Sequence, residues 1–547
     1  MALSNNGFDA IVIGAGHNGL SCAGYLSGAG LKVLVVERRS VVGGAVLTEE
    51  FHPGFRNSVF SYLVSLLDRS IMADLELARH GLTLIPRPGG SLSLLPGDHM
   101  YLPPDVVQAQ RAIARFSRAD AEVYPAFEEM LGDMGDLVRE IARDVPPNFG
   151  GGWSDLWRLF GKANAFRRLA PERQLQLTEL MTMSIGDFLN RWFDSDPIKG
   201  LYGFEGIIGN YANAFMPGTA YVLLHHVFGD IDGRTGAWAY ARGGMGSITQ
   251  AMANSCRSRG TQILTDAAVR EVKVLKGRAT GIVLEDGREF SANIVAANTH
   301  PQVLFGQLID PSEAPMAFQQ RIAGYRSESA TFRLNVALNA LPKFDSVAHD
   351  ASGLMAMQNT IDICPSLDYI DQAYTDAGNT GWAQKPVISM CIPTMLDDSL
   401  APKDCHVMSL FCQHFRRHLP HDQSWDQVKD AVADQIIDTV AAYAPTLKAS
   451  IVGRQINSPL DIERKLNMVG GDIFHGKLSL DQIFSLRPVG GYADHRMPVA
   501  GVYLCGSGAH PGGGVSGIPG KNAAGAILRD LKRPRLTGSN RPAPQAS

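Results

Sequence analysis

A glycine-rich turn between two apolar runs constrains the fold of this chain more than any other feature. Residues 10–13 read Ala-Ile-Val-Ile, and Gly14, Gly16 and Gly19 follow in a G-x-G-x-x-G pattern. In a strand–turn–helix unit the first glycine allows the tight turn, the second admits a pyrophosphate, and the third lets helix and strand pack closely. The free N–H groups at the helix start then favour the anion. The pattern predicts a dinucleotide-binding unit.

The second strand of this unit ends in an acidic residue. Residues 32–36 read Lys-Val-Leu-Val-Val, and Glu37 follows directly. A carboxylate at this place accepts hydrogen bonds from the ribose hydroxyls of an adenosine and repels a 2′-phosphate. Because the strand, the helix, the second strand and the acidic residue all occur at the expected spacing, a glycine-rich turn without a ligand is a poor explanation of this pattern.

Composition excludes several other classes of protein. The chain has 547 residues, of which 45% are hydrophobic and 19% charged, with a formal net charge of −4. No basic stripe exists to bind nucleic acid. Seven scattered cysteines without a C-x-x-C pair suggest neither a zinc site nor a redox-active disulfide, and they fit an intracellular setting. We predict no metal site, no secretory signal and no membrane span.

The nucleotide-binding pattern returns twice along the chain. A glycine turn at 243–246 leads into a helix and several strands that end with residues 294–297. The chain then closes with a second glycine cluster at 506–514 and a helix from about residue 520. Two long mixed segments separate these blocks, so we expect one fold assembled from distant pieces.

Five blocks carry a resemblance to a known family: IGAGHNGL, ERRSVVGGA, GTAYVLLHHVFG, LSLDQIF and VYLCGSGAHPGGGVSGIPGKNAA. With them the chain resembles the FAD-dependent phytoene desaturase-like oxidoreductases, and among these the pyridine nucleotide-disulfide oxidoreductase domain-containing group. The resemblance implies an α/β fold: a Rossmann-type FAD-binding domain built from residues 1–60, 235–305 and 490–532. A mixed α+β substrate domain, residues 61–234 and 306–489, is inserted into it, and the tail 533–547 is expected to be disordered. The group name contains the word "disulfide", but this sequence has no cysteine pair suited to form a redox-active disulfide.

Two further observations favour FAD over NAD. Gly43 and Gly44 follow Glu37 closely, so bare backbone can fold back against the pyrophosphate. The C-terminal glycines precede a helix whose positive N-terminal end can face the negative edge of a reduced flavin. The residues predicted to contact FAD are Gly14, Gly16, Asn18, Gly19, Glu37, Arg38, Gly43, Gly44, Val269, Gly506, Ser507, Gly513, Gly514 and Val515.

His510 is the candidate catalytic residue, because it lies inside the C-terminal glycine cluster, although a structural role is equally compatible with the sequence. His225 and His226 are adjacent on an apolar segment, so at most one of them can face a ligand. Flavin chemistry needs no nucleophile or metal from the protein. A missing catalytic triad therefore does not argue against an enzyme.

The resemblance implies chemistry on carbon–carbon bonds of an apolar, isoprenoid-like small molecule, by dehydrogenation, saturation or isomerisation. The two insertions carry aromatic residues, among them Trp153, Trp157 and Phe411, that we expect to enclose an apolar tunnel. A flavin amine oxidase and a membrane-associated flavoprotein with a binding or regulatory role remain as alternatives. Peripheral contact with a membrane is expected. The expected location is the cytoplasm or its membrane surface for a bacterial protein, and the mitochondrion for eukaryotic relatives.

Overall fold

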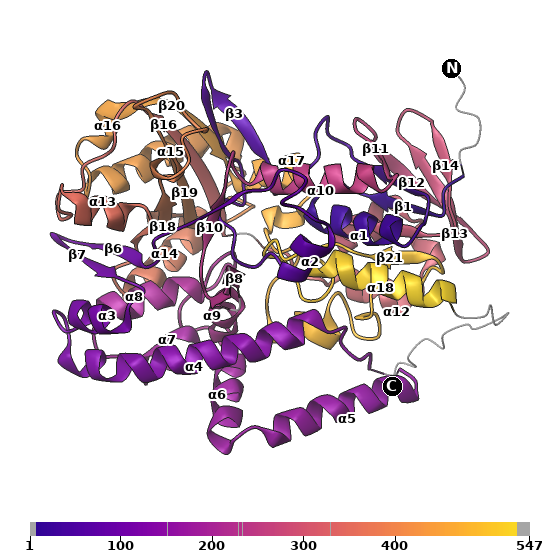
Figure 1. Cartoon of the computed structure of the whole chain (residues 1–547), viewed down its shortest axis with the longest axis horizontal. Coiled ribbons are helices and arrows are strands. Elements are labelled where there is room, and N and C mark those ends of the chain that lie inside the picture. Colours follow the sequence, from indigo (N-terminus) through magenta and orange to yellow (C-terminus); the bar gives the residue numbers. More distant parts are fainter. Residues whose placement is uncertain (1–6, 150, 228, 232, 329, 533–547) are drawn as a thin grey trace.

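The computed structural model describes residues 7–149, 151–227, 229–231, 233–328 and 330–532. The predicted disordered tail lies outside these residues. Figure 1 shows two parts side by side: a parallel sheet with its helices, and a larger sheet above a group of helices. The α/β class and the Rossmann-type unit predicted from the sequence are confirmed.

The first part is built on a five-stranded parallel sheet. Its strand order is β11-β2-β1-β15-β21, with β1 Ala10–Ile13, β2 Val33–Val36, β11 Gln262–Leu264, β15 Val295–Ala297 and β21 Val502–Leu504. These strands come from three distant stretches of the chain. The discontinuous origin that the glycine clusters indicated is thus visible in the strand order.

Alternate side chains of β1 enter two different cores, as strand geometry requires. Ala10 and Val12 pack with helices α1 (His17–Gly28), α10 (Gly246–Ser258) and α18 (Ile518–Lys532). Ile11 and Ile13 face the opposite side, toward a three-stranded sheet formed by β12 (Val269–Leu275), β13 (Arg278–Leu284) and β14 (Glu289–Ser291). Because both faces are covered, the strand is apolar throughout.

The second part contains a seven-stranded mixed sheet in the order β20-β16-β19-β18-β17-β6-β7. Its strands are β6 Ser91–Leu95, β7 Asp98–Leu102, β16 Thr331–Leu338, β17 Thr360–Ile363, β18 Trp382–Cys391, β19 His406–Phe415 and β20 Ile451–Asn457. One face, with Phe332, Leu334 and Val336, packs into a core with α13 (Ala351–Met357) and α15 (Trp425–Ala441). The other face packs against helices of the second part through Val387 and Phe411, and Asn335 on it reaches Ser58 of the first part.

Helices complete the second part. They are α3 Val106–Ile113, α4 Arg118–Arg143, α5 Trp153–Arg168, α6 Pro171–Thr182, α7 Ile185–Asn190, α8 Asp196–Glu205 and α9 Ala220–Val227. All of them except α5 share one hydrophobic core that includes Phe127, Phe188 and Leu224. Helix α5 runs along the outer edge of the molecule (Figure 1).

Candidate functional site

The glycine turn has the geometry that its sequence predicted. Gly14 has φ +94°, a conformation that disfavours any side chain, and its N–H bonds the carbonyl of Val36 at 2.8 Å. A Cβ at Gly19 would overlap the carbonyl oxygen of Gly14, so the helix can pack this closely only on a glycine. Gly16 is the N-cap of α1, and no described side chain makes a capping hydrogen bond there. Free N–H groups therefore point out of the sheet at the carboxyl end of β1.

Glu37 lies at the end of β2 with both carboxylate oxygens oriented by the backbone. Oε2 accepts the N–H of Ala15 at 2.9 Å, and Oε1 accepts the N–H of Arg39 at 3.0 Å. The side chain is 7% exposed and lies on a cavity wall. Each carboxylate oxygen has a second lone pair, and these are available for the two hydroxyls of a ribose.

The C-terminal glycine segment is fixed against the same turn. Asn18 on α1 donates from Nδ2 to Ser507 Oγ at 3.1 Å. The buried guanidinium of Arg487 donates to the carbonyls of Phe474 at 2.6 Å and Ser507 at 2.7 Å, and to three further carbonyls in the loop between them. One side chain thus connects the loop at 474–482 to the segment that begins at Ser507.

A single cavity of about 650 Å³ runs from this turn into the second part of the molecule. At one end its wall contains Gly14, Gly16, Glu37 and Val269. At the other end it contains side chains of the seven-stranded sheet and its neighbours: Tyr62, Ile208, Thr331, Arg333 and Phe411. Such a volume is within the range of sites for sizeable ligands.

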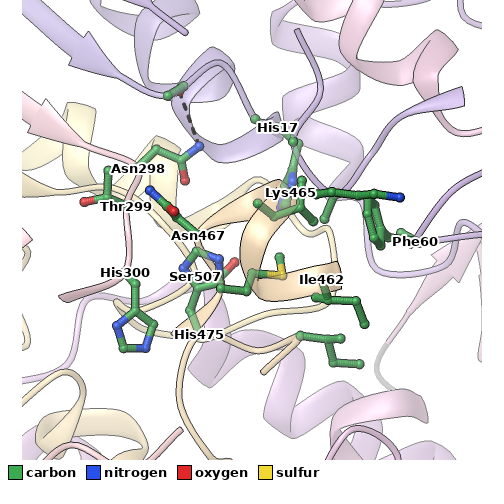
Figure 2. Close-up of a pocket in the computed structure, with 18 of the residues that line it drawn as sticks. His17, Phe60, Asn298, Thr299, His300, Ile462, Lys465, Asn467, His475 and Ser507 are labelled. Carbon is green, nitrogen blue, oxygen red and sulfur yellow. Dashed lines mark hydrogen bonds between the residues drawn. The ribbon is translucent and has the colours of Figure 1, made fainter. Parts of the chain in front are cut away.

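Several buried polar atoms around this cavity have no hydrogen-bond partner in the part of the chain that the structure describes, and they test whether a dinucleotide fits. They are His17 Nε2, Thr299 Oγ1 and His475 Nδ1. Figure 2 shows His17, Asn298, Asn467, His475 and Ser507 arranged around one central space. Burial lowers the pKa of His17 to about 3 and that of His475 to about 4, so both rings are neutral. Neutral donors and acceptors beside bare helix N–H groups suit a pyrophosphate-containing ligand.

The structure places the predicted cofactor residues in two groups. Those on the cavity wall are Gly14, Gly16, Glu37, Arg38, Gly44, Val269, Ser507, Gly514 and Val515. The others, Asn18, Gly19, Gly43, Gly506 and Gly513, lie behind the wall. Gly43 donates its N–H to the carbonyl of Ala15 at 2.9 Å, and Asn18 bonds Ser507, so these two shape the wall from behind.

His510 is not among the cavity-wall residues. Its ring is buried, and Nε2 lies 3.2 Å from the carbonyl of Ile141 on α4. Of the adjacent pair, His226 reaches the wall, whereas His225 lies behind it with Nε2 3.0 Å from the carbonyl of Gly513. The glycine cluster turns His510 toward α4 and away from the cavity wall, and its catalytic role stays a prediction.

The predicted enclosure of the tunnel by aromatic residues is wrong for Trp153 and Trp157. Their side chains are 80% and 72% exposed on α5, on the outside of the molecule. Phe411 does line the cavity. The pattern of aromatic residues alone could not separate a cavity wall from an outer helix.

Sequence reasoning also missed wall residues. Asn298, Thr299 and His300 directly follow β15 at the carboxyl edge of the parallel sheet, where ligands bind in such folds. The strand at 294–297 was the signal that could have found them. Ile462 and residues 464–468 and 473–475 also line the cavity, and no sequence pattern indicates them.

Comparison with known proteins identifies the family. A "NAD(P)-binding Rossmann-like domain" profile matches residues 12–71, and a "Flavin containing amine oxidoreductase" profile matches residues 90–370, half of the chain. "Pyridine nucleotide-disulfide oxidoreductase domain-containing protein 2" of Rattus norvegicus is 40% identical, over 96% of this chain and 94% of its own. "Phytoene desaturase (lycopene-forming)" of Pantoea ananas is 24% identical over 95% and 99%.

The chain belongs to the flavin-containing oxidoreductases of the amine oxidase and phytoene desaturase superfamily. A solved structure of a putrescine oxidase redesigned in cofactor binding shares this fold, with a TM-score of 0.60 and 17% identity over 96% of this chain and 99% of that one. The cofactor is FAD. In this flavoprotein, Glu37 would hold the adenosine ribose and the N-terminus of α1 the pyrophosphate.

Proposed function

We propose that this FAD-dependent oxidoreductase acts on carbon–carbon bonds of an apolar, isoprenoid-like substrate, by dehydrogenation, saturation or isomerisation. The observation that carries the proposal is the continuity of the cofactor site with apolar walls in the second part. Leu63, Leu66, Ile208, Phe411 and Phe474 lie on the same cavity wall as the nucleotide-binding residues. Bound FAD would supply hydride transfer, and the protein would hold the substrate in a water-poor space beside it.

The charge of the cavity wall argues against the amine oxidase alternative. The guanidinium of Arg333 lies 4.4 Å from the ring centroid of Tyr62 and 5.8 Å from that of Phe411. The aromatic faces that would cage a protonated amine already hold a cation. A second positive charge beside it in a buried site is unfavourable. A neutral hydrocarbon meets no such repulsion.

The test is a comparison of substrates on the purified flavoprotein. The flavin is photoreduced without oxygen, and its reoxidation is followed after addition of an isoprenoid olefin or a quinone. In parallel, the oxidised protein receives saturated isoprenoids or primary amines. Bleaching by a hydrocarbon or reoxidation by an olefin supports the proposal. Bleaching by amines alone assigns the protein to the amine oxidases instead.

We further propose that α5 contacts an anionic bilayer surface from which apolar substrate is taken up. Along this helix Trp153, Leu156, Trp157, Leu159, Phe160 and Phe166 are all more than one third exposed. At 100° per residue they cover about half of the helix circumference. Arg158 and Lys162 lie on the other side, and Arg167 and Arg168 end the helix. Aromatic and basic residues in this arrangement suit an interfacial helix.

Among the described residues, no helix combines the length and the apolar character that crossing a bilayer requires.

A further inference from the structure

Arg333 is a charged side chain buried in the wall of the substrate half of the cavity. It lies on β16 of the seven-stranded sheet and is 1% exposed. Its neighbours Phe332 and Leu334 point into the core on the opposite face, so Arg333 points toward the cavity. The guanidinium lies over the ring of Tyr62, which covers it from one side.

Hydrogen bonds fix the orientation of this guanidinium. Nη2 donates to Ser409 Oγ at 2.6 Å, and that hydroxyl donates to Asn335 Oδ1 at 3.1 Å. The amide of Asn335 in turn donates to the carbonyl of Ser58 at 3.0 Å and to Gln455 Oε1 at 3.1 Å. The charged group is therefore positioned by a chain of neutral polar groups rather than by a counter-ion.

The remaining donors of Arg333 have no partner among the described residues. Nε and Nη1 are buried and make no hydrogen bond to the described residues, and no described carboxylate is among the groups that influence the charge of Arg333. Arginine does not lose its proton in proteins, so the charge stays. A buried cation of this kind is strongly unfavourable unless an anion or water satisfies it.

The nearest acid in the same row of the sheet does not neutralise Arg333. Cross-strand pairing runs from Arg333 to Phe411, then to Ser389 and Asp362, so Asp362 is three strands away. Three strand spacings correspond to about 14 Å between the backbones. Burial raises the pKa of Asp362 to about 7, which also weakens any charge it could offer near neutral pH.

The other cations on the cavity wall differ from Arg333 in their acceptors: each bonds a carboxylate, amide or carbonyl oxygen, whereas Arg333 bonds only the hydroxyl of Ser409. Arg38 bonds Asn467 and the carbonyl of Arg464, Arg39 pairs with Glu49, Arg464 pairs with Asp426, and Lys465 bonds Asn457. The substrate half of the cavity thus offers one guanidinium with three free donors, which matches a singly charged anion. A diphosphate would bring more negative charge than one arginine balances.

We propose that Arg333 binds the carboxylate of an apolar acid, so that the substrate of this enzyme is a hydrocarbon with a carboxyl head group. This inference rests on the proposed function and narrows its substrate class. Two N–H donors of a guanidinium match the two oxygens of a carboxylate. With the head group at Arg333, the hydrocarbon lies along Phe411 and Ile208 and presents its carbon–carbon bonds toward the flavin. Arg333 acts as a specificity-determining residue.

The test uses the FAD-bound protein with two probes of equal chain length, decanoate and decanol. Binding is titrated through the change in flavin absorbance. In the wild type we expect decanoate to bind at least about tenfold more tightly than decanol, since a charge-assisted hydrogen bond contributes on the order of that factor or more. Arg333→Gln should abolish the preference while leaving decanol affinity within about twofold of wild type. Arg333→Lys should keep part of it. Lys448→Gln, which removes an exposed cation, is the matched control and should keep all of it.

The outcomes separate the two levels of the proposal. Equal affinity for decanoate and decanol in the wild type overturns the role of Arg333 and leaves the apolar-substrate function standing. If neither probe perturbs the flavin, both proposals fail. An Arg333→Gln protein that still binds decanoate more tightly than decanol overturns the role of Arg333. An Arg333→Gln protein that folds but retains no FAD overturns it as well. If this variant does not fold, the wild-type comparison and Arg333→Lys decide.

Discussion

Replacing Gly16 by valine tests the cofactor site at the point where its geometry is most informative. Gly16 has φ −74° and ψ 171°, a conformation that any residue adopts. A Cβ there would lie 2.9 Å from Asn298 Nδ2, the end of a movable side chain. We therefore expect the Gly16→Val protein to fold. By contrast, Gly14 has positive φ, and a Cβ at Gly19 would overlap backbone. Substitution of either would disrupt folding as well as binding.

The valine side chain would stand over the free N–H groups of α1 and keep a pyrophosphate away. Losing two hydrogen bonds to a charged phosphate costs about 3–6 kcal/mol, given about 1.5–3 kcal/mol for each. This corresponds to roughly a hundredfold to ten-thousandfold weaker binding of FAD. The expected result is a folded, colourless protein. The assay is the ratio of flavin to protein absorbance after desalting, together with titration of FAD into the apoprotein.

Gly152→Val provides the matched control. Gly152 is the N-cap of α5, with φ −73° and ψ −173°, and a Cβ there meets nothing within 4 Å. It adds the same side chain at a helix start that does not line this cavity, so FAD content should be unchanged. A Gly16→Val protein that folds and keeps full flavin content would refute the assignment of the pyrophosphate to α1.

Three further results are expected. NADH and NADPH should not reduce the flavin rapidly, because the chain has no second strand–glycine–helix unit ending in an acid; rapid anaerobic bleaching by either nucleotide would contradict this. Burial raises the pKa of the Asp362 carboxyl from 3.8 to about 7 in the folded protein, so folding favours the protonated form. The stability that this group contributes is therefore fully present below about pH 4 and is lost as the pH rises to about 7. Asp362→Asn should therefore raise the unfolding temperature at pH 8, by the equivalent of at most about 4 kcal/mol, and little at pH 4; an equal shift at both values would exclude titration as the cause. Trp157→Asp on α5 should weaken binding to anionic vesicles about tenfold. Leu275→Asp, which also replaces an exposed apolar residue, should not weaken it. Equal vesicle binding by both variants and the wild type would contradict the proposed membrane contact of α5.

The nucleotide-binding half was predictable because its signals are local. A glycine spacing, two buried strands and a terminal acid all lie within residues 10–37, and the geometry of Glu37 follows from its place at the end of β2. The placement of His510 depends instead on contact with α4, more than 360 residues earlier in the chain. No short-range pattern carries that information. The same holds for the cavity residues between 462 and 475, which lie on helix α17 (Pro459–Leu466) and in the segment after it, and which only tertiary packing brings to the cavity.

The substrate half left a weaker signal that the structure now explains. Strand β16 reads TFRLNVAL, in which Thr331, Arg333 and Asn335 alternate with Phe332 and Leu334. Such alternation usually marks one face in water, yet every residue of this strand is buried. The polar face is therefore covered by the cavity and the first part of the molecule rather than by solvent. Buried polar side chains are retained where they bind one another or a ligand. In this strand the amide of Asn335 is bonded to Ser58 and Gln455, whereas Nε and Nη1 of Arg333 have no partner among the described residues, which is why we assign Arg333 to ligand binding.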